Sequence, residues 1–174
     1  YSQATLPSAW SFSNVNLPAG WTESGTNFYT DSGNTPPAMK FDGTGDYLII
    51  NINSNPGDLT YYLTGNGFSG GTFTVEESDF GNVWSTVNTH NSPPNASYTM
   101  FTDVPQSSTR FIRFIYTNKV SGNIGLDDVS IDIGAATPIQ EINVMQSGNP
   151  LVSGSTYITN SPVSTLNSAT FLIE

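Results

Sequence analysis

Two adjacent carboxylates, Asp127 and Asp128, lie in a segment that alternates like a β-strand, Gly125–Ile133. Period-2 alternation places Asp127 on the same face as Val129 and Ile131, which must point into a core. Burying a carboxylate without a partner costs several kcal/mol, so a cation, an arginine or backbone N–H groups should lie beside it. These residues therefore imply either cation binding or an internal ion pair.

A calcium ion is the first of these alternatives. Ca²⁺ takes about six to eight oxygen ligands, several of them from carboxylates or backbone carbonyls. The loop at 41–46 offers the carboxylates of Asp42 and Asp46 from another part of the chain, although it lacks the spacing of an EF-hand. This alternative predicts a structural Ca²⁺ held by Asp127, Asp42 and Asp46.

An ion pair within a hairpin is the second alternative. Segments 110–116 and 124–133 are predicted to be two strands joined by a short polar loop. Antiparallel pairing would place Arg113 opposite Asp128 on the outer face, with Phe114 and Asp127 pointing inward. Both alternatives stay open at this point.

Exposed aromatic side chains are the candidates for ligand binding. The apolar face of a sugar ring stacks on an aromatic ring, while flanking polar groups take its hydroxyls. Alternation places Tyr62 outward, because its neighbours along the strand are expected in the core. The predicted ligand-binding residues are Trp84, Tyr62, Phe80, Tyr47 and Phe101. For each of them, packing at the edge of the core is the alternative.

The sequence has no set of residues with catalytic spacing. The single histidine, His90, lies in a polar stretch without a partner for metal binding or nucleophilic chemistry, and we expect it to be solvated. Glu76 and Glu77 are adjacent on a predicted strand, so they point to opposite faces and cannot act as one acid/base couple. Cysteine is absent, which excludes thiol chemistry. We expect no enzymatic activity.

The charge balance narrows the range of partners. The 174 residues include 14 acidic and 4 basic side chains, for a formal charge of −10, and charged residues make up only 10%. Nucleic acids and anionic membrane surfaces are disfavoured, because both require clustered Lys and Arg. No apolar run approaches the ~18 residues of a membrane span, so we expect no membrane insertion. A surface rich in Ser, Thr and Asn is common in secreted bacterial β-proteins.

Short alternating runs must position these residues. Clusters of Gly, Asn, Pro and Ser separate the runs, which predicts an all-β fold, an antiparallel β-sandwich without substantial helix. We expect the sandwich over 1–133, a linker at 134–138, and a partial β unit over 139–174 that is too small to build its own core. Strands are predicted near 10–12, 38–41, 46–52, 59–64, 72–77, 83–88, 97–104, 109–117 and 124–133, and then at 139–144 and 169–173.

Three motifs occur in an order and spacing that resemble a known family. They are Leu17–Thr22 (LPAGWT), Ser78–Trp84 (SDFGNVW), and Ile112–Phe114 (IRF) followed by Gly125–Ile131 (GLDDVSI). Together they resemble choice-of-anchor J and cleaved-adhesin domains, which are similar to MAM modules. The resemblance implies a jelly-roll β-sandwich, a non-catalytic role within a large secreted bacterial protein, and often a structural Ca²⁺. Residues 138–174 resemble the start of an immunoglobulin-like repeat of the choice-of-anchor D type.

These observations lead to one leading expectation and one alternative. The leading expectation is a non-catalytic carbohydrate-binding accessory module of a secreted or cell-surface multidomain bacterial protein, with a polysaccharide or glycan as its partner. The alternative is an adhesion or spacer module that binds protein or no ligand. In either case we expect a monomeric module within a longer chain.

Overall fold

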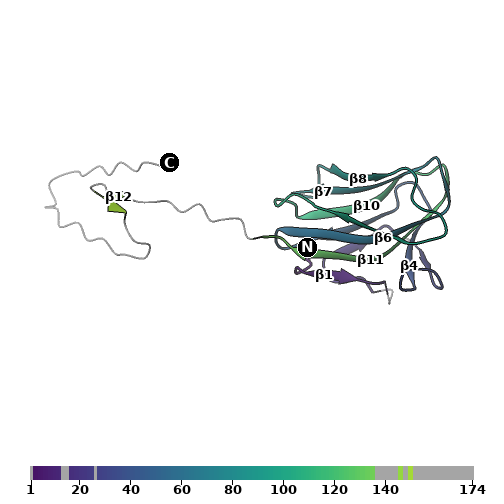
Figure 1. Cartoon of the computed structure of the whole chain (residues 1–174), viewed down its shortest axis with the longest axis horizontal. Coiled ribbons are helices and arrows are strands. Elements are labelled where there is room, and N and C mark those ends of the chain that lie inside the picture. Colours follow the sequence, from purple (N-terminus) through teal and green to yellow (C-terminus); the bar gives the residue numbers. More distant parts are fainter. Residues whose placement is uncertain (1, 13–15, 26, 136–144, 147–148, 151–174) are drawn as a thin grey trace. The chain divides into compact units, whose positions relative to one another are not determined.

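All regular structure is β-strand in the residues that the computed structural model describes, namely 2–12, 16–25, 27–135, 145–146 and 149–150. Internal contacts divide the chain into two units, Tyr1–Ala136 and Thr137–Glu174 (Figure 1). In the second unit, β12 (Met145–Gln146) and β13 (Asn149–Pro150) pair antiparallel. The strands predicted at 139–144 and 169–173 lie outside the described residues, so the immunoglobulin-like unit stays a prediction.

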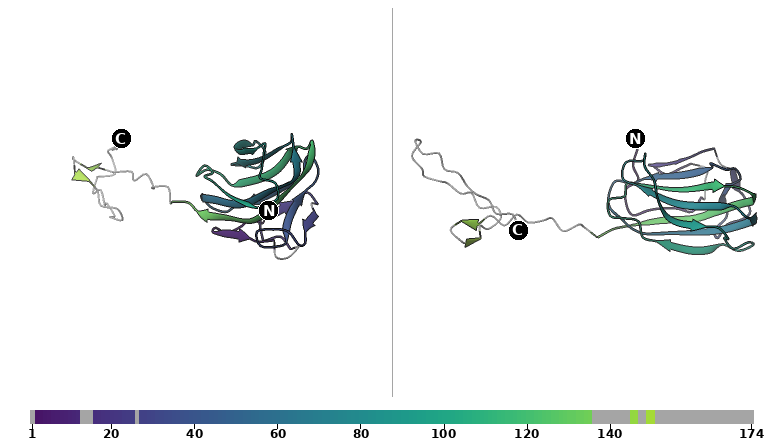
Figure 2. Two further views of the ribbon diagram at one scale, coloured as in Figure 1. Left: turned by 45° about the vertical axis from the view of Figure 1, so that its right-hand side comes forward. Right: turned by 90° about the horizontal axis from the view of Figure 1, so that it is seen from above.

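Two antiparallel sheets face each other in the first unit and form a β-sandwich (Figures 1 and 2). The six-stranded sheet has the order β3–β4–β11–β6–β9, with β1 also paired to β11, and the five-stranded sheet has the order β2–β5–β10–β7–β8. The absence of helix among the described residues confirms the predicted all-β class, and none of them forms a helix able to cross a membrane. The strands are β1 (Ser8–Trp10), β2 (Trp21–Glu23), β3 (Asn27–Tyr29), β4 (Ala38–Phe41), β5 (Tyr47–Asn51), β6 (Pro56–Ser69), β7 (Thr72–Ser78), β8 (Ser85–His90), β9 (Thr99–Asp103), β10 (Phe111–Asn118) and β11 (Ser121–Ile133).

The core lies between the two sheets and follows the predicted alternation. In β6 the side chains of Leu59, Tyr61 and Leu63 are fully buried, and β10 faces them with its own alternate residues. The rings of Tyr61 and Phe114 meet edge to face at 5.0 Å. Burying one such side chain contributes about 1.5–3 kcal/mol, so the core can hold the fold without disulfides.

The predicted hairpin of 110–116 with 124–133 is wrong. β10 pairs with β5 and β7 in one sheet, and β11 pairs with β1, β4 and β6 in the other. Every second side chain of a strand points into the core, whether two strands pair side by side in one sheet or face each other from opposite sheets. The hydrophobic pattern therefore predicted correctly that Phe114 is buried, but it could not identify the strand beside it.

A β-bulge at Asp127 and Asp128 changes which side chains of β11 face the core. Asp127 lies opposite Tyr62 and Ser130 opposite Thr60, so three residues of β11 span two of β6. Asp128 has a φ of 44°, a left-handed conformation that aspartate tolerates better than most residues. Core-facing side chains are therefore Leu126 before the bulge and Val129 after it. Contrary to the predicted alternation, Asp127 points to the outer face of the six-stranded sheet, beside Tyr62.

Candidate functional site

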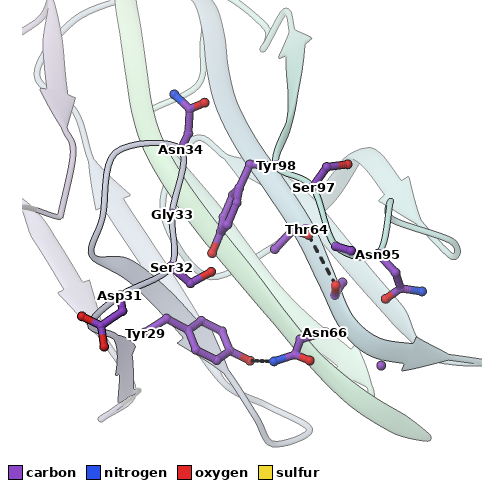
Figure 3. A pocket seen from close by; sticks show the side chains of 13 residues that line it. Tyr29, Asp31, Ser32, Gly33, Asn34, Thr64, Asn66, Asn95, Ser97 and Tyr98 are labelled. Atoms are coloured by element: carbon purple, nitrogen blue, oxygen red, sulfur yellow. Dashed lines mark hydrogen bonds between the residues drawn. The ribbon is translucent and has the colours of Figure 1, made fainter.

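A hollow of about 660 Å³ opens on the outer face of the six-stranded sheet. Three segments line it: the end of β3 with the β3–β4 connection, the C-terminal part of β6, and the segment that precedes β9. Figure 3 shows Tyr98 and Tyr29 as the two large side chains among mostly polar neighbours. The lining residues are Tyr29, Asp31, Ser32, Gly33, Asn34, Thr64, Gly65, Asn66, Gly67, Asn95, Ala96, Ser97 and Tyr98.

The β3–β4 connection forms the first wall of the hollow, and the β-bulge of β11 holds it in place. The Thr35 N–H donates to Oδ2 of Asp127 at 2.8 Å, and the Asp128 N–H donates to Oδ1 of Asp127 at 2.8 Å. The side chain of Asp128 in turn accepts hydrogen bonds from Asn34 Nδ2 at 2.8 Å and Thr35 Oγ1 at 3.1 Å. A Cβ at position 33 would lie 2.6 Å from Asp127 Oδ2, so Gly33 allows the close approach. Backbone N–H groups are therefore partners of the buried Asp127 carboxylate.

Burial sets the protonation of this carboxylate. Asp127 has no exposed surface, and burial raises its pKa to about 6. The N–H groups of Thr35 and Asp128 act in the opposite direction, because they stabilise the ionised form, while the negative charge of Asp128 raises the pKa further. The carboxyl group that anchors the β3–β4 connection thus has a pKa well above that of an ordinary aspartate.

Tyr98 lies directly on β11 because one residue of that strand is glycine. A Cβ at Gly125 would lie 2.4 Å from the Tyr98 hydroxyl and 3.0 Å from Thr64 Cγ2. Figure 3 shows the Tyr98 side chain pointing toward Ser32 of the first wall. Burial raises the pKa of the Tyr98 hydroxyl, and the neighbouring Ser32 side chain acts against this rise. The glycine within the strand gives the ring its place in the hollow.

The opposite wall comes from β6 and the segment before β9. Asn66 Nδ2 donates to the Tyr29 hydroxyl at 3.2 Å, which fixes the tip of that ring (Figure 3). Asn95 binds the backbone of Phe68 in both directions, accepting from its N–H at 3.2 Å and donating to its carbonyl at 3.4 Å. The hollow thus presents two aromatic rings, amide and hydroxyl groups, and one carboxylate, that of Asp31.

None of the five predicted ligand-binding aromatics lines this hollow. Trp84 and Tyr47 belong to the five-stranded sheet or its edge, and the guanidinium of Arg113 lies 4.1 Å from the Trp84 ring centroid. Phe80 is 82% exposed in the β7–β8 connection. Tyr62 is half-buried on the same sheet as the hollow, next to Asp127.

Phe101 is the one predicted candidate that packs against the core. Its ring stacks on Tyr61 at 5.7 Å and meets the His90 ring at 4.6 Å. The expectation that it is an exposed platform is therefore corrected. Phe101 lies opposite Tyr61 in the pairing of β9 with β6, and its side chain packs against the core as that of Tyr61 does. The five aromatics do not form one surface.

The three predicted calcium ligands do not come together. Asp46 accepts the N–H groups of Asp42 and Gly43 at 2.8 and 2.7 Å, and Asp42 forms an ion pair with Lys40 at 2.8 Å. The pairing of Leu126 with Met39 places Asp127 about 13 Å from Asp42 along the strand direction, at ~3.3 Å per residue. Within the described ranges, no three His, Cys, Asp or Glu side chains converge. A bound Ca²⁺ itself stays a prediction.

The predicted ion pair of Arg113 with Asp128 is also corrected. The Arg113 Nε donates to Glu76 Oε2 at 2.7 Å, within the five-stranded sheet. Asp128 instead binds the loop that walls the hollow, as described above. The cause is the wrong strand pairing, which placed β10 beside β11.

The histidine and the glutamate pair have structural partners. His90 is buried rather than solvated as predicted, and its Nε2 lies 2.8 Å from the Tyr61 hydroxyl, which donates to Asp103 at 2.7 Å. Burial lowers the pKa of His90, so its neutral form is favoured. Glu76 and Glu77 do point to opposite faces, since Glu76 binds Arg113 while Glu77 is buried.

Sequence reasoning does not find the residues of the hollow because they come from three segments far apart in the sequence. Tyr98 falls within the strand predicted at 97–104, but alternation does not place its ring beside Tyr29, and Asn66 lies in a glycine-rich stretch. One usable signal was Gly125, a glycine inside an otherwise well-formed strand. Such a residue often marks the close approach of another group, here the Tyr98 hydroxyl.

Comparison with known proteins identifies the fold. No protein-family model and no curated protein matches the sequence. The K3 cleaved adhesin domain of Lys-gingipain from Porphyromonas gingivalis W83 aligns with 74% of this chain and 98% of its own, at 18% identity and a TM-score of 0.58. The K2 cleaved adhesin domain of Lys-gingipain aligns with 71% of this chain and 94% of its own, at 17% identity and a TM-score of 0.55.

A third similar structure is a family 6 carbohydrate-binding module from Clostridium cellulolyticum in complex with xylose. It aligns with 74% of this chain and 99% of its own, at 16% identity and a TM-score of 0.49. At these identities the likeness concerns the fold alone. The chain therefore shares the sandwich fold of the cleaved adhesin domains, as the sequence motifs predicted.

Proposed function

We propose that this chain is a non-catalytic carbohydrate-binding module and that its ligand occupies the hollow on the six-stranded sheet. The observation that carries the proposal is the lining: the rings of Tyr29 and Tyr98 stand among amide and hydroxyl side chains in one space of about 660 Å³. Small-molecule sites usually measure about 300–1,000 Å³ and combine aromatic side chains with a few polar groups.

The chemistry of a sugar matches this lining. Each ring has an apolar face of C–H groups, which packs on an aromatic side chain, and an edge of hydroxyls that both donate and accept hydrogen bonds. Tyr29 and Tyr98 supply the rings, and the serine and asparagine side chains around them supply polar partners. The hollow therefore suits a ligand with alternating apolar and hydroxyl surfaces.

Binding without hydrolysis is the second part of the proposal. Glycosidases generally use two carboxyl groups that flank the scissile bond, about 5–10 Å apart. Asp31 is the single carboxylate among the lining residues. The acidic, cysteine-free composition and the fold shared with cleaved adhesin domains support a place in a secreted or cell-surface protein of several domains.

Adhesion to another protein is the second candidate function. The β7–β8 connection exposes 82% of Phe80 and 75% of Val83, and exposed apolar side chains often mark protein contacts. Ser78 Oγ fixes this loop by accepting the N–H groups of Phe80 and Gly81 at 3.3 and 2.9 Å. The Lys-gingipain domains with the same fold are named adhesin domains, which supports keeping this candidate.

A glycan array with matched variants separates the two functions. The chain should bind one or more glycans, and Tyr29→Ala or Tyr98→Ala should weaken that binding at least about tenfold. Trp84→Ala serves as the control, because Trp84 directly precedes β8 of the other sheet and does not line the hollow, and it should leave binding unchanged. If only Trp84→Ala or Phe80→Ala lowers binding, the ligand does not use the hollow. An array without any bound glycan would contradict the proposed function and favour the adhesion candidate.

A further inference from the structure

The hollow is poorly equipped to hold a negative charge. Its lining includes the carboxylate of Asp31 and no lysine, arginine or histidine. We infer that the ligand is a neutral, hydroxyl-rich saccharide and that uronates and sulfated sugars are rejected, an inference that rests on the proposed function. Discrimination by charge follows from three features of the structure: the position of every cation, the direction of the amide N–H groups, and the overall charge.

All four basic side chains of the chain are engaged with protein partners and none of them lines the hollow; Lys40 comes near it, with its Nζ 5.7 Å from the ring centroid of Tyr29. Each makes an ion pair or hydrogen bond with another part of the protein, so each would have to leave a partner to reach an anionic ligand. The pairs are Lys40 with Asp42 at 2.8 Å, Lys119 with Asn123 at 2.9 Å, Arg110 with Asn55 at 2.9 Å, and Arg113 with Glu76 at 2.7 Å. The single histidine is buried, and burial favours its neutral form.

The amide nitrogens in the walls are also directed at protein acceptors. Asn34 donates to the Asp128 carboxylate, Asn66 donates to the Tyr29 hydroxyl, and Asn95 donates to a backbone carbonyl. A carboxylate only accepts, so the orientation of the Asn34 amide is set by its partner. Anion sites in proteins rely on N–H donors or cations aimed at the ligand, and each of these amides directs at least one of its two N–H groups at a protein acceptor.

A neutral sugar meets the opposite situation. Its hydroxyls can donate to the Asp31 carboxylate and to amide oxygens. A carboxylate or sulfate group of a ligand has no hydrogen to donate to these acceptors, and its negative charge is repelled by Asp31. The formal charge of −10 adds a repulsion that an acidic polysaccharide would feel before contact, screened beyond about 8–10 Å at physiological salt. We expect acidic glycans to bind at least about tenfold more weakly than neutral counterparts with the same backbone.

The test uses the full chain and pairs of polysaccharides that share a backbone but carry neutral or anionic substituents. Methyl-esterified and de-esterified homogalacturonan form one pair, and hydroxyethylcellulose and carboxymethylcellulose form a second. An array of neutral, uronate-containing and sulfated glycans covers other backbones. Binding should be confined to neutral glycans and should not change between about 0.05 and 0.5 M NaCl, because no counterions are released.

A matched pair of variants assigns the discrimination to the hollow. Asp31→Asn removes the charge from the lining and should raise the affinity for the acidic member of a pair relative to the neutral one. Asp58→Asn removes an equal charge about 20 Å along β6 from Thr64, at ~3.3 Å per residue, and should leave the ratio unchanged.

The failures of the two proposals can be told apart. An acidic glycan bound as tightly as its neutral counterpart, or more tightly, overturns the charge inference and leaves the carbohydrate-binding function standing. A chain that binds no glycan overturns the function, and the inference falls with it.

Discussion

Gly125→Ala is the substitution that most sharply probes how the hollow is built. The added Cβ would lie 2.4 Å from the Tyr98 hydroxyl, about 1 Å inside an ordinary contact of 3.4 Å. The backbone of Gly125 does not have a positive φ, so alanine fits the strand itself. The clash concerns the far end of a side chain that begins in a loop, and we expect Tyr98 to swing out of the hollow while β11 stays in place.

The size of the effect follows from what Tyr98 loses. An aromatic contact contributes about 0.5–1.5 kcal/mol beyond its buried area, so displacing the ring should weaken glycan binding about threefold to tenfold. Overpacking in a site that cannot rearrange destabilises the folded state by about 1–3 kcal/mol, but here the ring of Tyr98 can move. Alanine is also favoured over glycine in a strand by about 0.5–1 kcal/mol, which offsets part of any remaining cost. The free energy of unfolding should therefore change by less than ~1 kcal/mol.

A double-mutant cycle with Tyr98→Ala gives the decisive assay. Affinity for an array-selected glycan is measured by titration calorimetry, and stability by thermal melting, for both single variants and the double variant. If Gly125 acts through Tyr98, adding Gly125→Ala to Tyr98→Ala should produce no further loss of affinity. Full affinity in Gly125→Ala, or an equal loss in the presence and absence of Tyr98, would refute the reasoning.

Three further predictions concern the scaffold. Glu77 accepts Gln106 N–H at 2.8 Å and the buried Thr109 hydroxyl at 2.7 Å, so Glu77→Ala should lower stability by about 3–5 kcal/mol, seen as a fall in melting temperature of roughly 10 °C or more; an unchanged melting temperature would contradict this role. Burial lowers the pKa of His90, so the unfolded chain binds the extra proton first, and stability should fall as the pH drops below about 6.5, the unperturbed histidine value; a denaturation series from neutral to acidic pH should show this slope, reduced in His90→Gln. Calcium binding by Asp127 predicts a higher melting temperature with excess Ca²⁺ than with chelator, a difference that Asp127→Asn abolishes; superimposable melting curves would contradict the prediction.

The hydrophobic pattern predicted which faces of the strands are buried. Alternation placed Tyr61 and Leu63, the neighbours of Tyr62, in the core, and the structure confirms both. Pattern alone did not predict which strands pair, because β10 and β11 present the same alternation to a shared core from opposite sheets. The information that separates the two cases lies in contacts distant in sequence.

The candidate site was harder to predict, for two physical reasons. One extra residue at the bulge reverses the parity of β11, so the buried apolar residues shift from Ile124 and Leu126 to Val129 and Ile131. Alternation counted from Val129 and Ile131 alone therefore placed Asp127 on the wrong face. The hollow is built from segments far apart in the sequence that meet only in the folded chain, with Tyr29 at the end of β3 and Tyr98 directly before β9. The aromatics chosen for their position on strands, such as Trp84, are held by other contacts, in that case with Arg113.

The most direct test of the central claim is to map where a glycan binds. Amide chemical shifts of the labelled chain are followed by NMR while a glycan selected on the array is added. The account predicts that the perturbed residues cluster at Asp31–Asn34, Thr64–Gly67 and Asn95–Tyr98, the three segments around the hollow. Perturbations concentrated on Phe111–Ile115 and around Trp84, with these segments unchanged, would contradict it.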